Sequence, residues 1–418
     1  MSEFTGVAPP LSGWGDRCLA VSRCAAVMAV GAVPFSSALT SVACAVMVLS
    51  WAISGQAVAT LGASLRQPLG VALTVFFALA AIGVLYSSAP WSDRLHTLWG
   101  WRRFGYALIL LGVFAPEAWK QRFVAVFFTA ASLGLVASFL SWVDIIGTRS
   151  GEFTGIVLQN HATQGIVFSL AILCAAHYAR NTSARTRWGL VAAMALFAGN
   201  IVFVTPGRSG YLALLVAAIV SGVMLYGWRR AHVWLPTGLA LAVLTLVASP
   251  MLRDRITQGW NEIDAAANPA IASAYTSMGI RTVLYGTTIE LIRERPVFGH
   301  GTGSFGKEYS ARVARQYTDW QAAPGADPHN QYLYIAMELG MVGLAAFIAV
   351  LITGFLALRA SPYGWIGGAA LAIWCLTSLF SSHFRTFPEG HLIGLFLGAM
   401  LAAAPSPPGS QMGLRHLR

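Results

Sequence analysis

The feature that most constrains this chain is the recurrence of long apolar runs along its whole length. Runs of roughly 17 to 25 apolar residues, enough for a helix to cross a bilayer, follow one another between short segments rich in charged, glycine and proline residues. A membrane β-barrel would show alternating segments of about ten residues instead. Only 10% of the residues are charged, whereas soluble domains carry about 25%. The sequence therefore predicts an all-α polytopic membrane protein and excludes a soluble enzyme.

We predict about twelve transmembrane helices in a single integral membrane domain that includes residues 1–418. Nine helices fall within residues 19–249 and three within residues 330–404, and a long polar segment at 250–328 separates the two groups. The predicted spans lie near 19–35, 38–54, 67–86, 101–115, 119–143, 160–179, 187–204, 211–228, 233–249, 330–358, 362–381 and 390–404. The apolar run that begins at Leu19 has no distinct cleavage pattern, so we expect a retained first span and not a signal peptide.

The basic residues predict the orientation of these spans. With a cytoplasmic N-terminus, the short inner segments hold thirteen Lys and Arg residues and the short outer segments hold six, as the positive-inside rule requires. Both termini are then cytoplasmic. The net charge of +11 is explained by topology, and no nucleic-acid-binding motif is visible. The five cysteines lie in or beside apolar runs without a CxxC pair, and they are interpreted as small membrane hydrophobes.

The segment 250–328 follows an odd-numbered span, so we predict a periplasmic loop of 79 residues. It holds half of the acidic residues in the chain, eight of 16. Structureless loops of this length are uncommon and usually functional, which favours a small folded module. Apolar side chains at helical spacing predict an amphipathic helix that ends before Pro296 and lies on the membrane surface. The residues of this stripe are Ile280, Val283, Leu284, Thr287 and Leu291.

Two arginines on the predicted outer side are candidate anion-binding residues. Arg208 lies in the Pro206–Gly210 turn, where backbone N–H groups can also meet an anion. The alternative is an arginine that snorkels at a span end. Arg281 lies on the amphipathic loop helix, and its alternative role is a contact with lipid headgroups.

His329 is the candidate base. The sequence Asp327-Pro328-His329 precedes the tenth span, and Asp and Pro favour the N-cap and first helical positions. His329 is then expected in the first turn of a long helix. The positive end of that helix disfavours imidazolium and leaves a neutral ring able to accept a proton. The alternative is a histidine that only bonds to backbone.

The remaining outer candidates are weaker. Arg103, His383 and Arg385 lie at predicted outer span ends and are candidates for substrate binding. Residues 301–306 match GxGxxG but lack a preceding strand, so we expect a tight turn there and no dinucleotide site. Glu262 and Asp264 form an acidic pair without a histidine at ligand spacing. We therefore expect neither a metal nor another cofactor.

Several motifs occur in a fixed order around the loop. An Arg-Ser-Gly turn is followed by an interior arginine, a Gly-rich turn and a histidine that leads into a helix; these motifs lie at 208–210, 281, 299–305 and 328–343. In this order, residues 205–345 closely resemble the O-antigen ligase and O-antigen polymerase superfamily of bacterial envelope glycosyltransferases. In the rest of the chain the resemblance is limited to the architecture of twelve predicted spans. By that resemblance Arg208, Arg281 and His329 fall on the family's functional positions, and the fold is expected to be of the membrane glycosyltransferase type C kind.

The resemblance implies a glycan donor carried on undecaprenyl diphosphate and, for a ligase, a sugar of the lipid A core as acceptor. Chemistry on the outer face has no ATP, so the reaction energy must come from a pre-activated donor, and the protein supplies positioning, charge and one proton acceptor. Arg208 and Arg281 can bind the diphosphate without a divalent ion. His329 can take the proton from the acceptor hydroxyl. A single base without a carboxylate nucleophile predicts inversion at the anomeric carbon.

Within the family, one dominant outer loop favours a ligase in the bacterial inner membrane with a periplasmic active site. An O-antigen polymerase and a protein O-oligosaccharyltransferase, which use the same donor, remain open. From another class, a secondary transporter or lipid flippase also fits twelve spans, although it favours ionisable residues at mid-membrane. The expected partners are the lipid-linked glycan, the lipid A-core acceptor and membrane lipids, with neither nucleic acid nor nucleotide.

Overall fold

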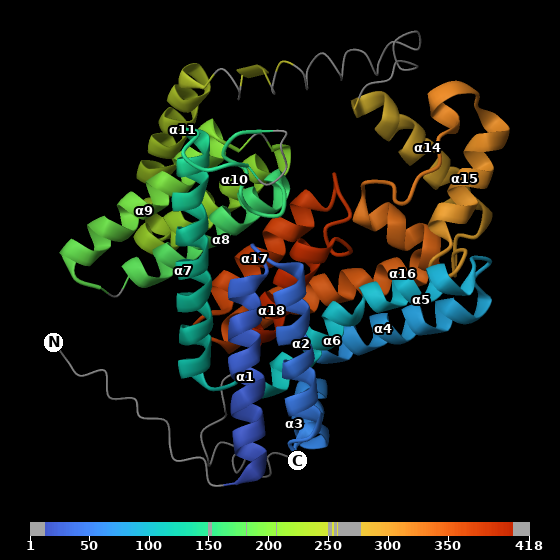
Figure 1. Ribbon diagram of the computed structural model, residues 1–418, viewed down its shortest axis with the longest axis horizontal. Helices are drawn as coiled ribbons and strands as arrows, with labels where there is room; N and C mark the ends of the chain where they lie inside the picture. Colours follow the sequence, from blue (N-terminus) through green and yellow to red (C-terminus); the bar gives the residue numbers. More distant parts are fainter. Residues whose placement is uncertain are drawn as a thin grey trace.

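A computed structural model describes residues 13–148, 153–180, 182–205, 207–249 and 277–403, with residues 253, 254 and 257 between the last two ranges. The described residues form helices and connecting segments without a strand (Figure 1). Each predicted span coincides with a helix. The corresponding helices are α1 (Trp14–Ala32), α2 (Ser37–Ala52), α4 (Pro68–Tyr86), α6 (Arg102–Val113), α7 (Glu117–Trp142), α8 (His161–Ala179), α9 (Ala184–Phe203), α10 (Arg208–Tyr226), α11 (Ala231–Ala248), α16 (Gln331–Leu356), α17 (Gly364–Thr377) and α18 (Phe387–Leu401).

Fewer helices than twelve have the length and composition of a membrane span. Among the described residues six helices meet both conditions, or seven if α2 and α3 (Ala57–Leu65), which meet at 103°, are counted as one broken span. The helix α6 has 12 residues and is therefore about 18 Å long, whereas the hydrocarbon core is about 30 Å thick. The polytopic membrane architecture is supported, and the number twelve stays a prediction.

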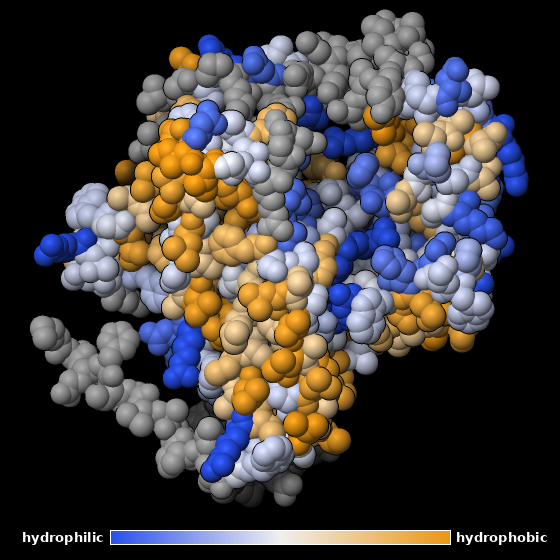
Figure 2. All heavy atoms as spheres, viewed as in Figure 1, coloured by the Kyte–Doolittle hydropathy of each residue, from blue (hydrophilic) through white to orange (hydrophobic). Residues whose placement is uncertain are grey.

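Large apolar side chains remain exposed along the outward faces of the spanning helices. Leu49 on α2, Leu85 on α4 and Leu133 on α7 are 63%, 75% and 63% exposed. Figure 2 shows hydrophobic residues gathered over α1, α2 and α7. Lipid tails, unlike water, accept such a surface without cost, which explains why these helices are apolar on both their inward and outward faces.

The interior of the helix bundle is formed by α8, α17 and α18 (Figure 1). The helix α8 packs most closely against α10. A Cβ added at Gly165 of α8 would lie 2.5 Å from the Gly210 Cα of α10. Small residues at this crossing let the two backbones approach, which is a common packing mode of membrane helices.

The predicted tenth span is interrupted at Gly340, where φ is +66° inside α16. The segment that follows α14 (Ser277–Glu294) lies against this interruption. Met341 N donates to Pro296 O at 2.8 Å, and Gly301 N donates to Glu338 O at 2.7 Å. The loop after α14 is thereby fixed to α16, and its Gly-rich part is the tight turn expected from the sequence, with positive φ at Gly301 and Gly303.

The polar segment contains folded elements, as expected, but the apolar stripe of its amphipathic helix packs against protein and not against a membrane surface as predicted. The helix is α14, and Val283, Leu284 and Leu291 of its stripe are buried in the protein core. It packs against α16 and against α15 (Phe305–Gln316). The stripe contacts protein because α15, η2 (Asp319–Ala322) and the following loop fold back over it (Figure 1). Glu262 and Asp264, the predicted acidic pair, lie outside the described residues.

Candidate functional site

His329 lies just before α16 and not in its first turn, so this part of the sequence prediction was wrong. The N-cap is Asn330, whose Oδ1 accepts hydrogen bonds from the N–H groups of Tyr332 and Leu333. His329 precedes the cap in a left-handed conformation with φ +52°. Asn, not Asp, satisfies the free helical N–H groups here. The imidazole is thus held by a strained turn at the N-terminus of α16.

The carboxylate of Asp327 fixes this turn. Its Oδ1 accepts a hydrogen bond from His329 N at 2.7 Å and another from Ser382 Oγ at 3.0 Å. The Nδ1 atom of His329 lies 3.4 Å from the same oxygen. A carboxylate beside Nδ1 favours the tautomer that carries its proton there, which leaves Nε2 free to accept one. Asp327 and His329 therefore have the arrangement of a base and the group that orients it.

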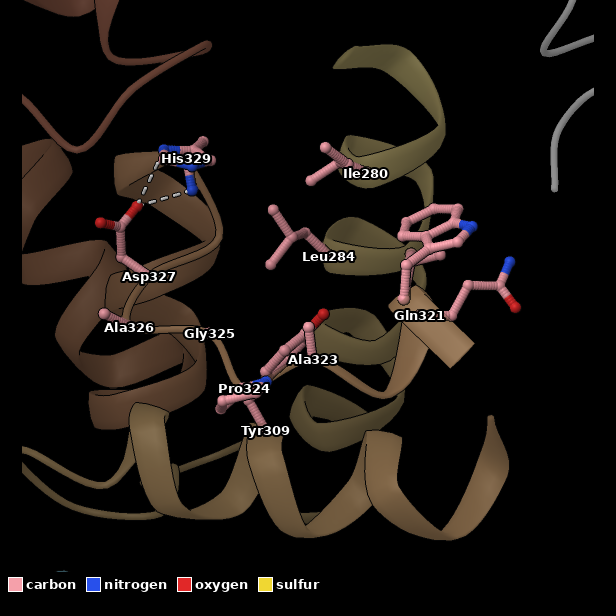
Figure 3. Close-up of a pocket in the computed structure, with 12 residues that line it drawn as sticks. Ile280, Leu284, Tyr309, Gln321, Ala323, Pro324, Gly325, Ala326, Asp327 and His329 are labelled. Atoms are coloured by element: carbon pink, nitrogen blue, oxygen red, sulfur yellow. Dashed lines mark hydrogen bonds and ion pairs between the residues drawn. The ribbon is translucent and has the colours of Figure 1, made fainter. Parts of the chain in front are cut away.

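The histidine borders a cavity of about 310 Å³ between α14, the segment before α16 and η2. Figure 3 shows His329 and Asp327 on one side of this cavity, opposite Ile280 and Leu284 of α14. The side chain of His329 is 53% exposed. Its ring is therefore accessible to a substrate that enters the cavity.

Arg281 lies half-buried near the start of α14, beside the cavity-lining residue Ile280. One helical turn further on, Tyr285 Oη donates hydrogen bonds to His329 O at 3.4 Å and to Leu379 O at 3.1 Å. Residues i and i+4 share a helix face. The fold thus brings the helix face of Arg281 to His329, although more than 40 residues separate them.

Arg208 is the first residue of α10, and Gly207 is its N-cap. A Cβ added at Gly207 would lie 3.1 Å from the ring of His161, the first residue of α8. From α8, Thr163 Oγ1 donates to Glu389 of α18 at 2.6 Å. Arg208 is therefore placed beside the start of α8, whereas Arg281 lies on α14 and His329 lies just before α16.

His383 and Arg385, two of the weaker candidates, lie in the connection between α17 and α18 that Ser382 fixes to Asp327. His383 is 3% exposed, and burial lowers its pKa while the charges of Glu389 and Asp327 act in the opposite direction. The guanidinium of Arg385 lies over the ring of Tyr334, 4.0 Å from its centroid. These two side chains are thus on the His329 side of the molecule.

Arg103, the third weaker candidate, is 6% exposed on α6. Its Nη1 donates to the carbonyl oxygens of Phe384 and Arg385. The guanidinium is thereby placed beneath the connection that carries His383 and Arg385, where it supports the backbone of that connection.

Two groups that the sequence reading did not identify belong to this region. Tyr285 ties α14 to the turn of His329, and Glu338 accepts hydrogen bonds from Tyr334 Oη at 2.5 Å and Phe305 N at 3.4 Å. Asp327 was identified only as an expected helix cap. Its position two residues before His329 was a usable local signal, whereas the contacts of Tyr285 and Glu338 depend on segments distant in sequence.

Comparisons with known proteins agree with the motifs in this region. Residues 192–348 match the family model described as O-antigen ligase. A curated O-antigen ligase of Salmonella typhimurium is 23% identical over 225 residues, 53% of this chain and 52% of the relative. An uncharacterized protein of Haemophilus influenzae is 22% identical over 251 residues, 59% of this chain and 61% of the relative. The chain thus matches between half and two thirds of the length of these curated relatives.

One solved structure, titled "Structural coordination of polymerization and crosslinking by a peptidoglycan synthase complex", aligns with 80% of this chain and 95% of its own. The sequence identity is 16% and the TM-score is 0.44.

Proposed function

Because residues 192–348 belong to the O-antigen ligase family, we propose that this protein is an O-antigen ligase of the bacterial inner membrane. It transfers an O-antigen glycan from undecaprenyl diphosphate to a sugar of the lipid A-core oligosaccharide. The reaction takes place on the periplasmic face, where both substrates carry their sugars. It uses neither a nucleotide nor a metal ion.

The observation that carries this proposal is the pairing of Asp327 with His329 at the edge of an open cavity. The oxygen of Asp327 lies 3.4 Å from Nδ1, so Nε2 is the ring atom that accepts the proton. An acceptor hydroxyl in the cavity gives its proton to Nε2 as its oxygen attacks the anomeric carbon of the donor. The bond from that carbon to the diphosphate breaks, and undecaprenyl diphosphate leaves. One displacement inverts the anomeric configuration.

The leaving diphosphate needs positive charge close to it. Arg281 provides it from α14, and Arg208 provides it from the N-terminus of α10, where backbone N–H groups also favour anions. Arginine binds phosphate oxygens through two parallel hydrogen bonds. His383 and Arg385 lie in the connection that Ser382 fixes to Asp327, and of the two only Arg385 is partly exposed for a polar contact with the substrate. The two arginines lie on different helices, α10 and α14, and the proposal requires both to bind the same diphosphate.

A metal-free transfer assay tests the proposal. Purified protein is supplied with undecaprenyl-diphosphate-linked glycan and lipid A core, and wild type is compared with His329→Ala and Arg281→Ala. We expect both variants to lose transfer, His329→Ala by about 10²- to 10⁴-fold, the usual contribution of a general base. The matched control is Arg293→Ala, which removes an exposed arginine from the last turn of α14 and should leave transfer unchanged.

The same assay separates the alternatives. Glycan lengthening without transfer to the core would assign a polymerase, and transfer to a protein hydroxyl would assign an oligosaccharyltransferase. Movement of the lipid-linked glycan across vesicles without any transfer would assign a flippase. Net retention at the anomeric carbon would contradict the single-displacement mechanism.

A further inference from the structure

The cavity beside His329 has two chemically different walls. On one side α14 presents apolar side chains, Ile280 and Leu284 among them (Figure 3). Another wall is the segment 323–326, whose side chains are small, so that its backbone borders the cavity. The half-buried Trp320 of η2 adds an aromatic ring to the lining. The cavity therefore complements a molecule with an apolar face and a polar rim.

The backbone of the segment 323–326 has hydrogen-bonding groups to offer. In the described part of the chain, the N–H and C=O groups of Gly325 and Ala326 make no hydrogen bond. Each of these residues thus presents one donor and one acceptor. A sugar hydroxyl is both a donor and an acceptor, so it can pair with either group.

The cavity also lacks a fixed positive charge. None of the described residues that line it is a lysine or an arginine, and its one carboxylate belongs to Asp327. Arg281 follows the lining residue Ile280 but is not itself part of the lining. A phosphate group here would lose water without gaining a cation, and it would face the Asp327 carboxylate. The cavity therefore favours an uncharged ligand, and the diphosphate of the donor belongs outside it.

The chain that borders the cavity is held in a fixed shape. Asp319 and His329, on either side of it, have φ values of +55° and +52°, which residues other than glycine rarely adopt. Such residues persist where the surrounding structure imposes them, and they cluster at ligand-binding sites. A Cβ added at Gly325 would lie 2.8 Å from the ring of Tyr309, so the chain rests directly on that ring. The cavity is thus formed before a ligand enters it.

We propose that this cavity binds one uncharged pyranose ring of the acceptor and that Trp320 selects this ring. The inference rests on the proposed function. A pyranose has an apolar C–H face, which stacks on an indole ring, and a rim of hydroxyls, which pair with the backbone of Gly325 and Ala326. Ligand pockets usually enclose about 300–1,000 Å³, and a cavity of about 310 Å³ accommodates one ring. The attacking hydroxyl of that ring then lies beside His329.

Binding of a core oligosaccharide to purified full-length protein tests this subsite without any transfer reaction. The oligosaccharide is released from lipid A and dephosphorylated. Saturation-transfer NMR identifies which of its rings contacts the protein, and a titration gives its Kd. Trp320→Ala removes the aromatic face and should raise the Kd about tenfold, the size of one good stacking contact. The matched control is Trp188→Ala, which removes an exposed tryptophan of α9 and should keep the wild-type Kd.

A second pair of variants keeps the test valid if Trp320→Ala does not fold. Ala323→Trp fills the cavity from an exposed position. Ala314→Trp adds the same side chain at an exposed position of α15 outside the cavity. We expect saturation transfer to a single ring to disappear in Ala323→Trp and to remain in Ala314→Trp. Equal Kd values for these two variants would overturn the proposal.

A competitor distinguishes the acceptor sugar from the leaving group. Inorganic diphosphate carries the charge of the leaving group without its hydrocarbon chain, and the cavity offers it no lysine or arginine among its described lining residues. We expect it to leave the oligosaccharide bound. Displacement of the oligosaccharide by inorganic diphosphate would assign the cavity to the diphosphate and overturn the proposal.

The outcomes distinguish the subsite from the ligase. In the transfer assay, Trp320→Ala should raise the KM for the acceptor and leave the KM for the lipid-linked donor unchanged. If no acceptor is ever glycosylated but oligosaccharide binding still depends on Trp320, the ligase fails and the subsite stands. If glycan is transferred and Trp320→Ala leaves the KM for the acceptor unchanged, the subsite fails and the ligase stands.

Discussion

At the scale of single residues, the site depends on one carboxylate that accepts hydrogen bonds from two segments. Asp327 bonds to the backbone of His329 and to Ser382 in the connection between α17 and α18. It therefore sets both the orientation of the imidazole and the position of the loop that carries His383 and Arg385. A residue with two such roles should be sensitive to changes that preserve its size.

We predict that Asp327→Asn lowers the rate of glycan transfer. The amide keeps the shape of the side chain but loses the charge that favours the proton on Nδ1 of His329, so fewer rings have Nε2 free. The expected loss in kcat is about 10- to 100-fold, smaller than for removal of the base itself. Ser382→Ala, which removes one hydrogen bond to Asp327 and leaves the charge in place, is the control. An equal loss in both variants would mean that loop position, and not the charge of Asp327, controls the rate.

The buried imidazole of His383 predicts a pH dependence of stability. Burial lowers its pKa below the ordinary value, so above about pH 6.5, the usual unfolded value, the group is neutral in both states. Below that pH the unfolded chain takes up a proton that the folded state binds less readily. Stability contributed by the neutral ring is therefore lost as the pH falls from about 6.5 toward the folded pKa.

This dependence can be measured by thermal unfolding in detergent between pH 8 and pH 5. We expect the Tm of His383→Gln to fall less steeply over this range than that of wild type. His96→Gln, at an exposed histidine of α5 (Trp91–Gly100), serves as the control and should follow the wild-type slope. Parallel slopes for all three proteins would contradict an effect of His383.

At the scale of secondary structure, the position of α14 depends on the interruption of α16. Gly340 adopts a conformation that favours glycine, and an added Cβ would meet Val297 O at 2.2 Å. The segment 296–301 pairs with the backbone exposed there. Because α14 leads directly into this segment, the interruption places Arg281 relative to His329.

We predict that Gly340→Ala destabilises the protein by about 1–3 kcal/mol, the cost of a strained backbone position, and abolishes transfer. The physical reason is that an alanine displaces the segment after α14 from α16. Gly286→Ala is the matched control, because Gly286 lies within α14 and a Cβ there meets nothing within 4 Å. That change should stabilise the protein slightly, since alanine favours helix over glycine by about 0.8–1 kcal/mol. Normal transfer by Gly340→Ala would show that α14 docks without the interruption.

At the scale of the whole molecule, contacts between helix ends agree with the predicted alternation of spans. Lys120, predicted on the inner side, is 1% exposed and donates from Nζ to Ser361 Oγ at 2.8 Å and to Ala402 O, which are also predicted there. Asp327 and Ser382, predicted on the outer side, likewise meet. These contacts join residues that the sequence assigns to the same side, and the alternation of the spans stays a prediction.

The side that faces the cytoplasm stays a prediction, and cysteine labelling checks it. In a background without the five native cysteines, a cysteine is introduced by Ser92→Cys at the start of α5, on the predicted outer side. It should react in intact spheroplasts with a thiol reagent that cannot cross the membrane. Ser183→Cys before α9 should react only after permeabilisation. Both positions are exposed in the structure, so burial does not explain a failure to react. The reverse pattern would invert the topology and place the cavity of His329 on the cytoplasmic side.

Local patterns in the sequence were sufficient to predict where the helices lie and to identify the main candidates for the site. The apolar runs predicted a helix at each of the twelve positions, because hydrophobicity and length are properties of contiguous residues. They did not determine how many helices cross the bilayer: α6, α17 and α18 are short, and α2 and α3 meet at a sharp bend. The motifs around Arg208, Arg281 and His329 were likewise contiguous, and the match of residues 192–348 to the O-antigen ligase family confirms the resemblance.

What the sequence by itself determined is therefore the helical membrane class, the resemblance of residues 192–348 to the O-antigen ligase family and the residue types available for chemistry. Only the tertiary structure decided that His329 precedes its helix, that the stripe of α14 faces protein, and that Asp327, Tyr285 and Ser382 meet around one turn. These features depend on contacts between segments far apart in the chain, and helical periodicity specifies which face of a helix is apolar but not which partner covers it.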